Sequence, residues 1–443
     1  MQVAVLGGGL QGCCTALALA ESGVRVTLFD RNEQLLSRAA VANEGKIHLG
    51  YMYAGDPSLS TARTMMRGTL AFAPFFARHL GKPSDGFAVS APAVYLVHRD
   101  SQHGPEEVEA YLGSVHRLVS EAAEGRPRAY FGIEFPAKLR AWNEAERGAE
   151  FNPAIALAAF STPEVAIDPV ELARAIRNRV AAEPRIEVRL RHAVRSVSKD
   201  GERLCVSSEA REGGDGADRD RYDHVVNALW DGRLAVDHSF GLTTDRPWLH
   251  RLKYGVSFRN PARTASRSVT VISGPFGEVV EHGGGLTYLT WYPECLRGIS
   301  RQTTPPEWDT YLAEPLRSRL IGGTLSALAE IVPALGALNG EHLPELCVKG
   351  GVIVAWGQTD IYDPDSELHR RFAIGITSVG RFSLDRPRKA HHGAVLRRDV
   401  RRPHRRRRLD GRTARHHRRP RVSGPRGSPH HAGVSEDPDI RQS

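Results

Sequence analysis

The stretch MQVAVLGGGLQGCCTALALAESGVRVTLFD, residues 1–30, decides the fold. Residues 2–6 predict a short buried strand, residues 10–22 an alanine-rich helix, and residues 24–29 a second strand that ends in Asp30. Between the first strand and the helix lie three glycines in the pattern G-x-G-x-x-G: Gly7, Gly9 and Gly12. This order predicts a Rossmann-like βαβ unit within an α/β fold.

Each position of the glycine pattern has a physical role in holding a dinucleotide. The first glycine permits the tight turn, the second lets the backbone approach a pyrophosphate at the helix N-terminus, and the third brings helix and strand together. The acid that ends the second strand can accept hydrogen bonds from a ribose. We therefore expect cofactor contacts from Gly7, Gly9, Leu10, Gln11, Gly12, Asp30 and Arg31. The alternative is a glycine-rich turn in an unrelated α/β protein.

Composition and charge narrow the class of protein. Residues 381–443 contain 19 of the 60 lysines and arginines but only 6 of the 51 acidic residues. The remaining chain carries 41 basic and 45 acidic groups, so the net positive charge of the protein comes from its last 63 residues. No apolar run reaches about 18 residues, which argues against a membrane-spanning helix or a secretory signal. The five cysteines form no CxxC pair, so we expect a reduced, cytoplasmic setting and no metal site.

Two of these cysteines, Cys13 and Cys14, fall in the first turn of the predicted helix. A thiol at a helix N-terminus can have a lowered pKa, which would suit a redox role. We favour the simpler interpretation that both are small residues packed under the sheet.

A second stretch, residues 39–68, carries a resemblance to a known family. Its pattern N-x-G-x-I-H-x-G, residues 43–50, is followed by Tyr53. It resembles the segment that passes the flavin ring in D-amino-acid-oxidase-like FAD-dependent oxidoreductases. That superfamily includes amine and amino-acid oxidases, sarcosine dehydrogenase relatives, glycerol-3-phosphate dehydrogenase and 2-hydroxyglutarate oxidases, and the pattern is most similar to the last of these.

Four later segments resemble the same family in the same order, over roughly residues 1–380: residues 162–176, 185–197, 222–234 and 350–371. The resemblance implies that FAD is the cofactor, contacted by Asn43, Gly45, Lys46, Ile47, Val194, Asn227, Ala228, Gly350 and Gly351. The residues themselves agree, since glycine-rich turns suit a flavin slot. The chain also lacks a second G-x-G-x-x-G, which argues against a built-in NAD(P)H domain.

The FAD-binding segments are interrupted, which predicts two interleaved domains. We assign residues 1–85, 155–235 and 345–381 to a discontinuous FAD-binding domain, and residues 86–154 and 236–344 to a substrate domain. In the substrate domain, residues 104–125 predict an amphipathic helix. The strands of a mixed or antiparallel sheet are predicted at residues 87–98, 252–258, 268–273, 276–280 and 286–293. In the resembling family such a sheet covers the flavin face.

The chemistry that the resemblance implies is hydride removal from a C–H next to nitrogen or oxygen, in a small amine, amino acid or 2-hydroxy acid. His48 is the candidate catalytic residue, because an imidazole can remove a proton near neutral pH. A covalent flavin link and a purely structural histidine are the alternatives.

Other side chains are candidates to line the substrate pocket. Lys253 and Lys349 are candidates to hold a carboxylate or to activate dioxygen. Residues 266–300 contain no lysine of the kind that some oxidases of the family use, so oxidase and dehydrogenase both stay open and the electron acceptor is not assigned. Aromatic residues that could line the pocket, although strand aromatics more often lie in a core, are Tyr254, Tyr288, Trp291, Tyr292 and Trp356.

The family pattern is lost at Phe382, and residues 382–443 form a basic tail of Arg, His, Pro, Gly and Ala that we predict to be disordered. We hypothesise a frame-shift from about residue 382. The third base of each codon is free to vary, so codons for residues 385–408 can be chosen with a second frame in mind. Read one base later, the same bases can then encode TDPGKLTTAPYFAETCADRIAGG. This product is similar to the family's flavin-capping loop and last helix. A frame-shifted chain would lack both.

A genuine basic tail that binds nucleic acid or an anionic membrane is the alternative. It has no interleaved aromatic residues and no recognisable reading module, so neither partner is expected. The competing functions are accordingly a flavoprotein-like scaffold or nucleic-acid-associated protein without turnover, and, more narrowly, an NAD-dependent dehydrogenase.

Overall fold

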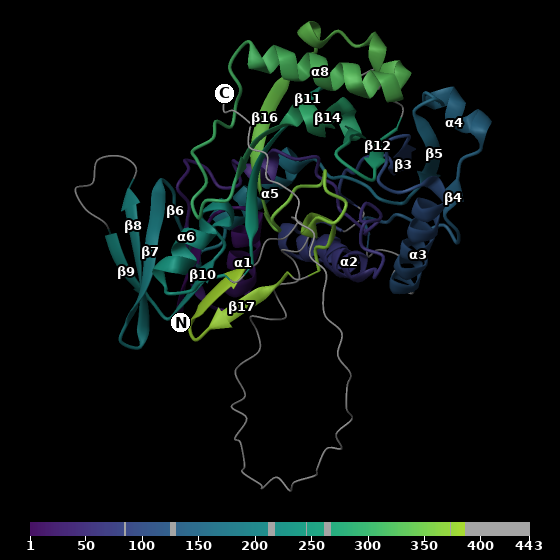
Figure 1. The fold of residues 1–443 in the computed structure, drawn as a ribbon. Coiled ribbons are helices and arrows are strands. Elements are labelled where there is room, and N and C mark those ends of the chain that lie inside the picture. Colours follow the sequence, from purple (N-terminus) through teal and green to yellow (C-terminus); the bar gives the residue numbers. More distant parts are fainter. Residues whose placement is uncertain are drawn as a thin grey trace, which may run out of the picture. The chain divides into compact units, whose positions relative to one another are not determined.

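A six-stranded sheet carries the opening βαβ unit in the computed structural model of the chain (Figure 1). β1 (Gln2–Leu6), α1 (Leu10–Glu21) and β2 (Arg25–Phe29) follow one another as predicted. The glycine turn therefore lies at the carboxyl ends of parallel strands, where α/β sheets bind ligands. The structure describes residues 1–83, 86–124, 130–210, 218–244, 246–260, 267–372 and 374–385.

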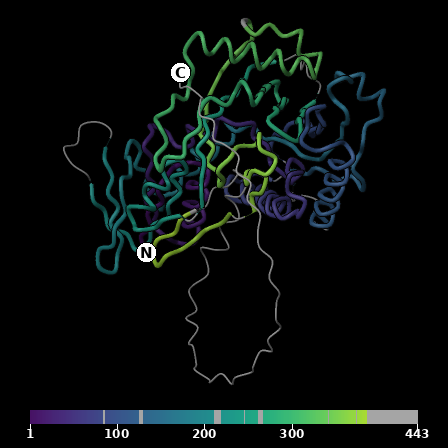
Figure 2. Tube along the Cα trace, viewed as in Figure 1, coloured from purple at the N-terminus to yellow at the C-terminus, as the bar shows by residue number. Residues whose placement is uncertain are grey.

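The order of this sheet is β17-β18-β10-β1-β2-β6. Its remaining strands are β6 (Ile186–Arg189), β10 (His224–Asn227), β17 (Ile376–Val379) and β18 (Phe382–Asp385). Neighbours are parallel except in the β17–β18 hairpin. The two ends of the described chain thus meet in one sheet, as the purple and yellow segments of Figure 2 show.

The chain remains part of this sheet beyond the point where the family pattern is lost. Phe382 is fully buried and stacks on Phe240, with ring centroids 4.5 Å apart, and it pairs with Val225 of β10. The prediction of a disordered tail was therefore wrong for residues 382–385, because an aromatic core contact and strand pairing hold β18 in place. The rest of the predicted tail, residues 386–443, lies outside the described residues.

The second sheet is mixed and has nine strands, as predicted for the substrate half. Only β12 and β3 pair in parallel. Its strands are β3 (Val94–His98), β4 (Arg140–Ala141), β5 (Ala156–Ser161), β11 (Trp248–Arg259), β12 (Val269–Ile272), β13 (Gly277–Glu281), β14 (Leu286–Trp291), β15 (Leu296–Ser300) and β16 (Cys347–Trp356). Two of them, β5 and β16, come from segments that we had assigned to the FAD-binding domain.

Helices flank both sheets. α3 (Pro105–Ala123) forms where residues 104–125 predicted it. α8 (Leu316–Ile331) packs against β13 and β14 and lies at the top of Figure 1. The other helices are α2 (Ser60–Leu80), α4 (Glu144–Glu150), α5 (Pro169–Ala181), α6 (Arg233–Ser239) and α7 (Tyr292–Cys295). Within the described ranges, no helix combines the length and apolarity needed to cross a bilayer.

Short 3-10 turns and a small sheet complete the described fold. The 3-10 turns are η1 (Ala39–Val41), η3 (Trp230–Gly232), η4 (Gly283–Gly285), η5 (Pro333–Ala337), η6 (Gly340–His342) and η7 (Glu367–His369). A three-stranded antiparallel sheet contains β7 (His192–Asp200), β8 (Arg203–Ala210) and β9 (Asp218–Tyr222). It includes part of the predicted 185–197 segment, of which Val194 lies on β7.

Candidate active site

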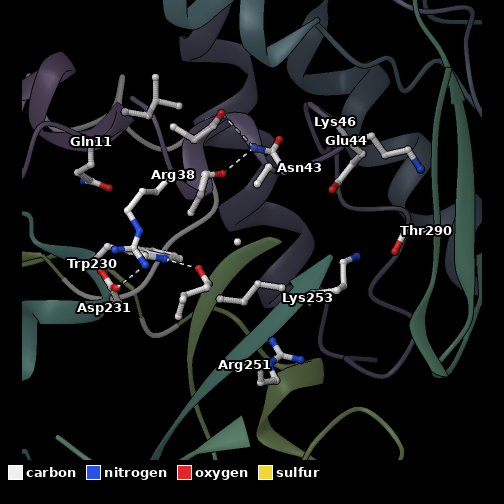
Figure 3. A pocket seen from close by; sticks show the side chains of 18 of the residues that line it. Gln11, Arg38, Asn43, Glu44, Lys46, Trp230, Asp231, Arg251, Lys253 and Thr290 are labelled. Atoms are coloured by element: carbon white, nitrogen blue, oxygen red, sulfur yellow. Dashed lines mark hydrogen bonds and ion pairs between the residues drawn. The ribbon is translucent and has the colours of Figure 1, made fainter. Parts of the chain in front are cut away.

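One continuous cavity of about 540 Å³ joins the glycine turn to the nine-stranded sheet. At one end it is lined by Gly7, Gly9, Leu10 and Gln11, and at the other by side chains of β11, β13 and β14. Figure 3 shows Gln11 and Arg38 on one side of this space and Lys46, Lys253 and Thr290 on the other. A long molecule can therefore reach from the βαβ unit to the substrate sheet.

The glycine turn is built as tightly as its sequence pattern requires. Gly7 has a φ of 98°, and a Cβ there would lie 2.5 Å from the carbonyl oxygen of Ala228. A Cβ on Gly12 would lie 1.8 Å from the carbonyl oxygen of Gly7, so Gly12 allows α1 to pack on the turn. Gly9 differs, because no atom lies within 4 Å of the position its Cβ would take. The open space at Gly9 belongs to the cavity.

The N-terminus of α1 offers hydrogen-bond donors to this space. Gly9 is the N-cap of α1 and provides no side-chain cap, so the first backbone N–H groups of the helix can reach an anion. The side-chain nitrogen Nε2 of Gln11 is buried and has no hydrogen-bond partner among the described residues. A buried donor of this kind fits a ligand oxygen, so the residues present suit a diphosphate.

Asp30 and Arg31 lie beside the turn, as predicted. Asp30 accepts hydrogen bonds from the backbone nitrogens of Gly8 and Asn32, both at 2.8 Å. Arg31 donates to Asp231 at 2.9 Å. The carboxylates of Asp30 and Asp231 both line the cavity, and their hydrogen bonds fix the shape of its wall.

The segment of the N-x-G-x-I-H-x-G pattern borders the middle of the cavity. The Asn43 amide donates to the carbonyl oxygens of Ala39 and Ala40, and its oxygen accepts from the Gly45 nitrogen at 2.8 Å. Gly45 has a φ of 72°, and a Cβ there would lie 1.9 Å from the carbonyl oxygen of Ile167. Asn43 thus fixes the loop, and Gly45 lets it pass close to the chain before α5.

Several predicted cofactor residues lie behind the cavity wall. Asn227 uses its amide to bind Arg233 and Asp237 of α6, and a Cβ on Gly350 would meet the Tyr254 ring at 2.7 Å. The predicted contacts that line the cavity are Gly7, Gly9, Leu10, Gln11, Asp30, Arg31, Asn43, Lys46, Val194, Ala228 and Gly351, and the candidate base His48 lines it too. Those that do not line it, because they pack against other parts of the chain, are Gly12, Gly45, Ile47, Asn227 and Gly350.

Lys46 joins the segment to the nine-stranded sheet. Its side chain is 1% exposed, and its Nζ lies 2.6 Å from Oε2 of Glu278 on β13. The same nitrogen donates to the Thr270 hydroxyl on β12 and lies 5.6 Å above the Tyr95 ring. This buried ion pair ties the segment of residues 43–50 to β12 and β13 of the nine-stranded sheet.

His48 lies between two carboxylates. Its Nδ1 is 3.1 Å from Oε1 of Glu164, and its Nε2 is 3.7 Å from Oε1 of Glu44, which lines the cavity. Burial would raise the pKa of Glu164, but the charge and hydrogen bond of His48, with Lys46 and Tyr95, lower it to about 2. We missed Glu164 in the sequence, although an acid inside the otherwise apolar TPEVAI stretch was a signal.

Cationic side chains gather at the substrate end. Alternation along β11 places Arg251 and Lys253 on the cavity face. Arg251 donates to Asp360 at 2.8 Å and to the Tyr292 hydroxyl at 2.6 Å, and Lys253 lies 5.9 Å from the centre of the Tyr292 ring. Arg371 also lines the cavity, and burial lowers the pKa of its guanidinium. Among the described residues, no carboxylate forms an ion pair with Lys253 or Arg371.

The remaining aromatic and lysine candidates lie away from this space. Tyr292 lines the cavity, whereas Tyr254, Tyr288, Trp291 and Trp356 do not. Lys349 contacts Tyr311 instead, with its Nζ 5.5 Å from the ring centre. The side chains that do not line the cavity point to other surfaces of the sheet because of their position along the strands.

The two thiols near the turn are inert in this setting. Cys13 and Cys14 are buried, and burial raises the pKa of both. This favours the packing interpretation over a redox role. Within the described residues, no group of three or more His, Cys, Asp or Glu side chains is arranged to hold a metal ion.

Comparison with known proteins decides the family. The model of the family described as FAD dependent oxidoreductase, DAO, matches residues 2–356. The chain belongs to this family. It is therefore an FAD-dependent oxidoreductase, and FAD is its cofactor. This finding goes against the alternative of an NAD-dependent dehydrogenase.

Solved structures with the same fold cover most of the chain. Glycine oxidase from Geobacillus kaustophilus is 16% identical with a TM-score of 0.62, covering 90% of this chain and 92% of that one. L-Proline dehydrogenase from P. horikoshii is 16% identical with a TM-score of 0.61, over 90% and 93%. The L-alpha-glycerophosphate oxidase from Mycoplasma pneumoniae, with FAD bound, is 16% identical with a TM-score of 0.59, over 90% and 93%.

Similarity to characterised sequences is confined to short stretches. D-Amino acid dehydrogenase 1 of Mesorhizobium japonicum is 39% identical over 85 residues, which are 18% of this chain and 20% of that protein. The FAD-dependent monooxygenase FPY4 of Fusarium mangiferae is 42% identical over 50 residues, 11% of this chain and 14% of that protein. The chain thus matches a fifth or less of the length of these relatives.

Proposed function

We propose that this protein oxidises a C–H bond next to nitrogen or oxygen in a small amine, amino acid or 2-hydroxy acid. The observation that carries the proposal is the continuous cavity that runs from the glycine turn past His48 to a cationic wall. Glycine oxidase and L-proline dehydrogenase, which share the fold, are named for amino acids, and the glycerophosphate oxidase is named for a hydroxylated phosphate ester. All three substrates carry an acidic group.

The residues at the glycine turn, with Lys46 and Gly351, are those that would hold FAD. When bound, FAD supplies the acceptor for the hydride that leaves the substrate carbon. Lys253 and Arg371 bind the acidic group of the substrate and set its orientation, because each presents a cation without a carboxylate partner among the described residues. Orientation is the main protein contribution to a hydride transfer.

His48 accepts the proton that the reaction releases. Loss of a hydride from carbon and of a proton from the neighbouring O–H or N–H turns the substrate into a carbonyl compound or an imine. Nε2 of His48 faces the cavity side at Glu44 and is the base on this path. A cytoplasmic location is part of the proposal, because all five cysteines are free thiols.

Anaerobic reduction of bound FAD tests this function. The full chain, loaded with FAD, is mixed with a panel of amines, amino acids and 2-hydroxy acids, and the loss of the flavin's visible absorption is followed. We expect reduction by at least one acidic member of the panel. A loaded protein that no member reduces would contradict the proposal.

A pair of lysine variants tests the acidic group. Lys253→Met removes a cation at the cavity, and we expect KM for an acidic substrate to rise about 10-fold or more, since hydrogen bonds to charged groups contribute about 1.5–3 kcal/mol. Lys349→Met makes the same change on neighbouring β16, away from the cavity, and is expected to leave KM unchanged. Equal effects in both variants would remove Lys253 from the proposal.

A further inference from the structure

Glu164 is a buried carboxylate whose position the reaction has not yet explained. It lies between β5 and α5, outside any helix or strand, and its side chain has no solvent exposure. Burying a charge is costly unless hydrogen bonds compensate it. A glutamate in this place therefore needs either a structural or a chemical reason.

Three donors compensate the charge of Glu164. Its Oε2 accepts the backbone nitrogen of Leu49 at 2.7 Å, and its Oε1 accepts the Tyr95 hydroxyl and faces Nδ1 of His48 at 3.1 Å. An ionised carboxylate can only accept hydrogen bonds, so Nδ1 of His48 must carry a proton. The lone pair of a neutral His48 ring is then on Nε2.

The second nitrogen of His48 lies on the cavity side. Nε2 is 3.7 Å from Oε1 of Glu44, a residue that lines the cavity and has a 17% exposed side chain. A proton taken up at Nε2 would give an imidazolium that lies between the carboxylates of Glu164 and Glu44. The hydrogen bond between Nδ1 and Glu164 thus fixes both the tautomer and the orientation of the His48 ring.

We propose that Glu164 is a positioning residue, which holds the proton of His48 on Nδ1 and leaves Nε2 to receive the O–H or N–H proton of the substrate. The inference rests on the proposed function for the identity of that proton. The alternative is that Glu164 only anchors the chain at Leu49. The two readings differ in what they predict when the carboxylate becomes an amide.

Glu164→Gln is the decisive change because the amide has one oxygen and one NH2 group. The backbone nitrogen of Leu49 can only donate, so it holds the amide oxygen. The NH2 group then faces Tyr95 and His48, whose hydroxyl and Nδ1 can both accept. Donation to Nδ1 moves the ring proton to Nε2, and the base is lost while the anchor at Leu49 remains.

The tautomer can be read without turnover or cofactor. In a protein with ¹⁵N-labelled histidines, the His48 signals are identified by their loss in His48→Gln. We expect the proton on Nδ1 in the wild-type chain and on Nε2 in Glu164→Gln. A wild-type His48 with its proton on Nε2 would overturn the proposal, and this measurement holds even if the variant fails to fold.

Anaerobic flavin reduction supplies the second measurement. With a substrate found in the panel, we expect Glu164→Gln to slow reduction on the order of 100-fold or more, as for wrong-tautomer variants of other histidine bases. The rise of the rate with pH should also be lost. The dependence of the reduction rate on pH also involves the titratable and charged groups around His48. These groups are Glu44, Lys46, Tyr53, Tyr95 and Glu164. Burial raises the pKa of Tyr53, and the charge of Arg371 acts in the opposite direction.

Glu281→Gln is the matched control, since it changes a buried glutamate on β13 that bonds Thr287 and does not line the cavity. It should leave the tautomer, the rate and the pH profile unchanged. An unchanged rate and pH profile in Glu164→Gln would refute the positioning role and leave the anchor reading. A wild-type enzyme that no substrate reduces would instead contradict the proposed function, while the tautomer still tests Glu164.

Discussion

The buried pair of Lys46 and Glu278 offers the sharpest test of how the segment of residues 43–50 is held to the nine-stranded sheet. Lys46→Met removes the ammonium but keeps a side chain of similar length. Glu278, with an 8% exposed side chain, is then left without the cation that lies 2.6 Å away. We expect a large loss of stability, because a buried charge has lost its partner.

The size of the loss follows from this burial. Removing one partner of a buried ion pair costs about 3–5 kcal/mol, whereas replacing both by apolar residues is often neutral. The entropy of unfolding is about 2.1 cal/mol/K per residue near 60 °C, or roughly 0.8 kcal/mol/K for about 385 residues. Lys46→Met should therefore lower Tm by about 4–6 °C. The double variant Lys46→Met with Glu278→Met should recover most of this loss.

The assay is thermal unfolding of the full chain without FAD, so that cofactor affinity does not enter the comparison. Each variant is measured at one scan rate and one protein concentration. A single variant whose Tm stays within about 1 °C of wild type would show that the Lys46–Glu278 pair does not stabilise the fold as stated. So would a double variant as unstable as the single one, since the loss would then come from packing and not from the unpaired charge.

Three further predictions concern the fold, its pH dependence and the end of the chain. Phe382→Ala should cost about 3–5 kcal/mol, because it removes a fully buried ring stacked on Phe240, and an unchanged Tm would place β18 outside the cooperative fold. Glu164 has a pKa of about 2 against an ordinary 4.5, so its contribution to stability is complete above pH 4.5 and is lost as the pH falls towards 2. Denaturant unfolding of Glu164→Gln across this window should accordingly show a weaker pH dependence, and parallel curves for the two proteins would count against an ionised Glu164. Gene sequencing and intact mass should reveal a frame-shift from about residue 382, and a chain with the restored ending should bind FAD more tightly. An unaltered frame in verified DNA would end that hypothesis.

Local patterns predicted the first part of the fold well. The strand, glycine turn, helix and second strand of residues 2–29 appear within one residue of the expected bounds. This unit can be predicted from the sequence because each element depends on residues only a few positions away. The local signals are the hydrophobic pattern of the strands, the helical propensity of residues 10–22 and the steric demands of the glycine turn. The mixed sheet was also expected, although its strand ends shifted, as where β14 ends at Trp291 and the short helix α7 begins at Tyr292.

The sequence by itself determined the dinucleotide-binding unit, and with it the end of the cavity at Gly9 and Gln11. Only the tertiary structure decided which charges meet across that cavity. His48 and Glu164 are 116 residues apart, and Lys46 and Glu278 are 232 apart. Such pairs depend on sheet register and on the crossing of distant segments, which no local pattern encodes. The FAD-dependent oxidoreductase family was therefore predictable from the sequence, while the carboxylate partners of His48 were not.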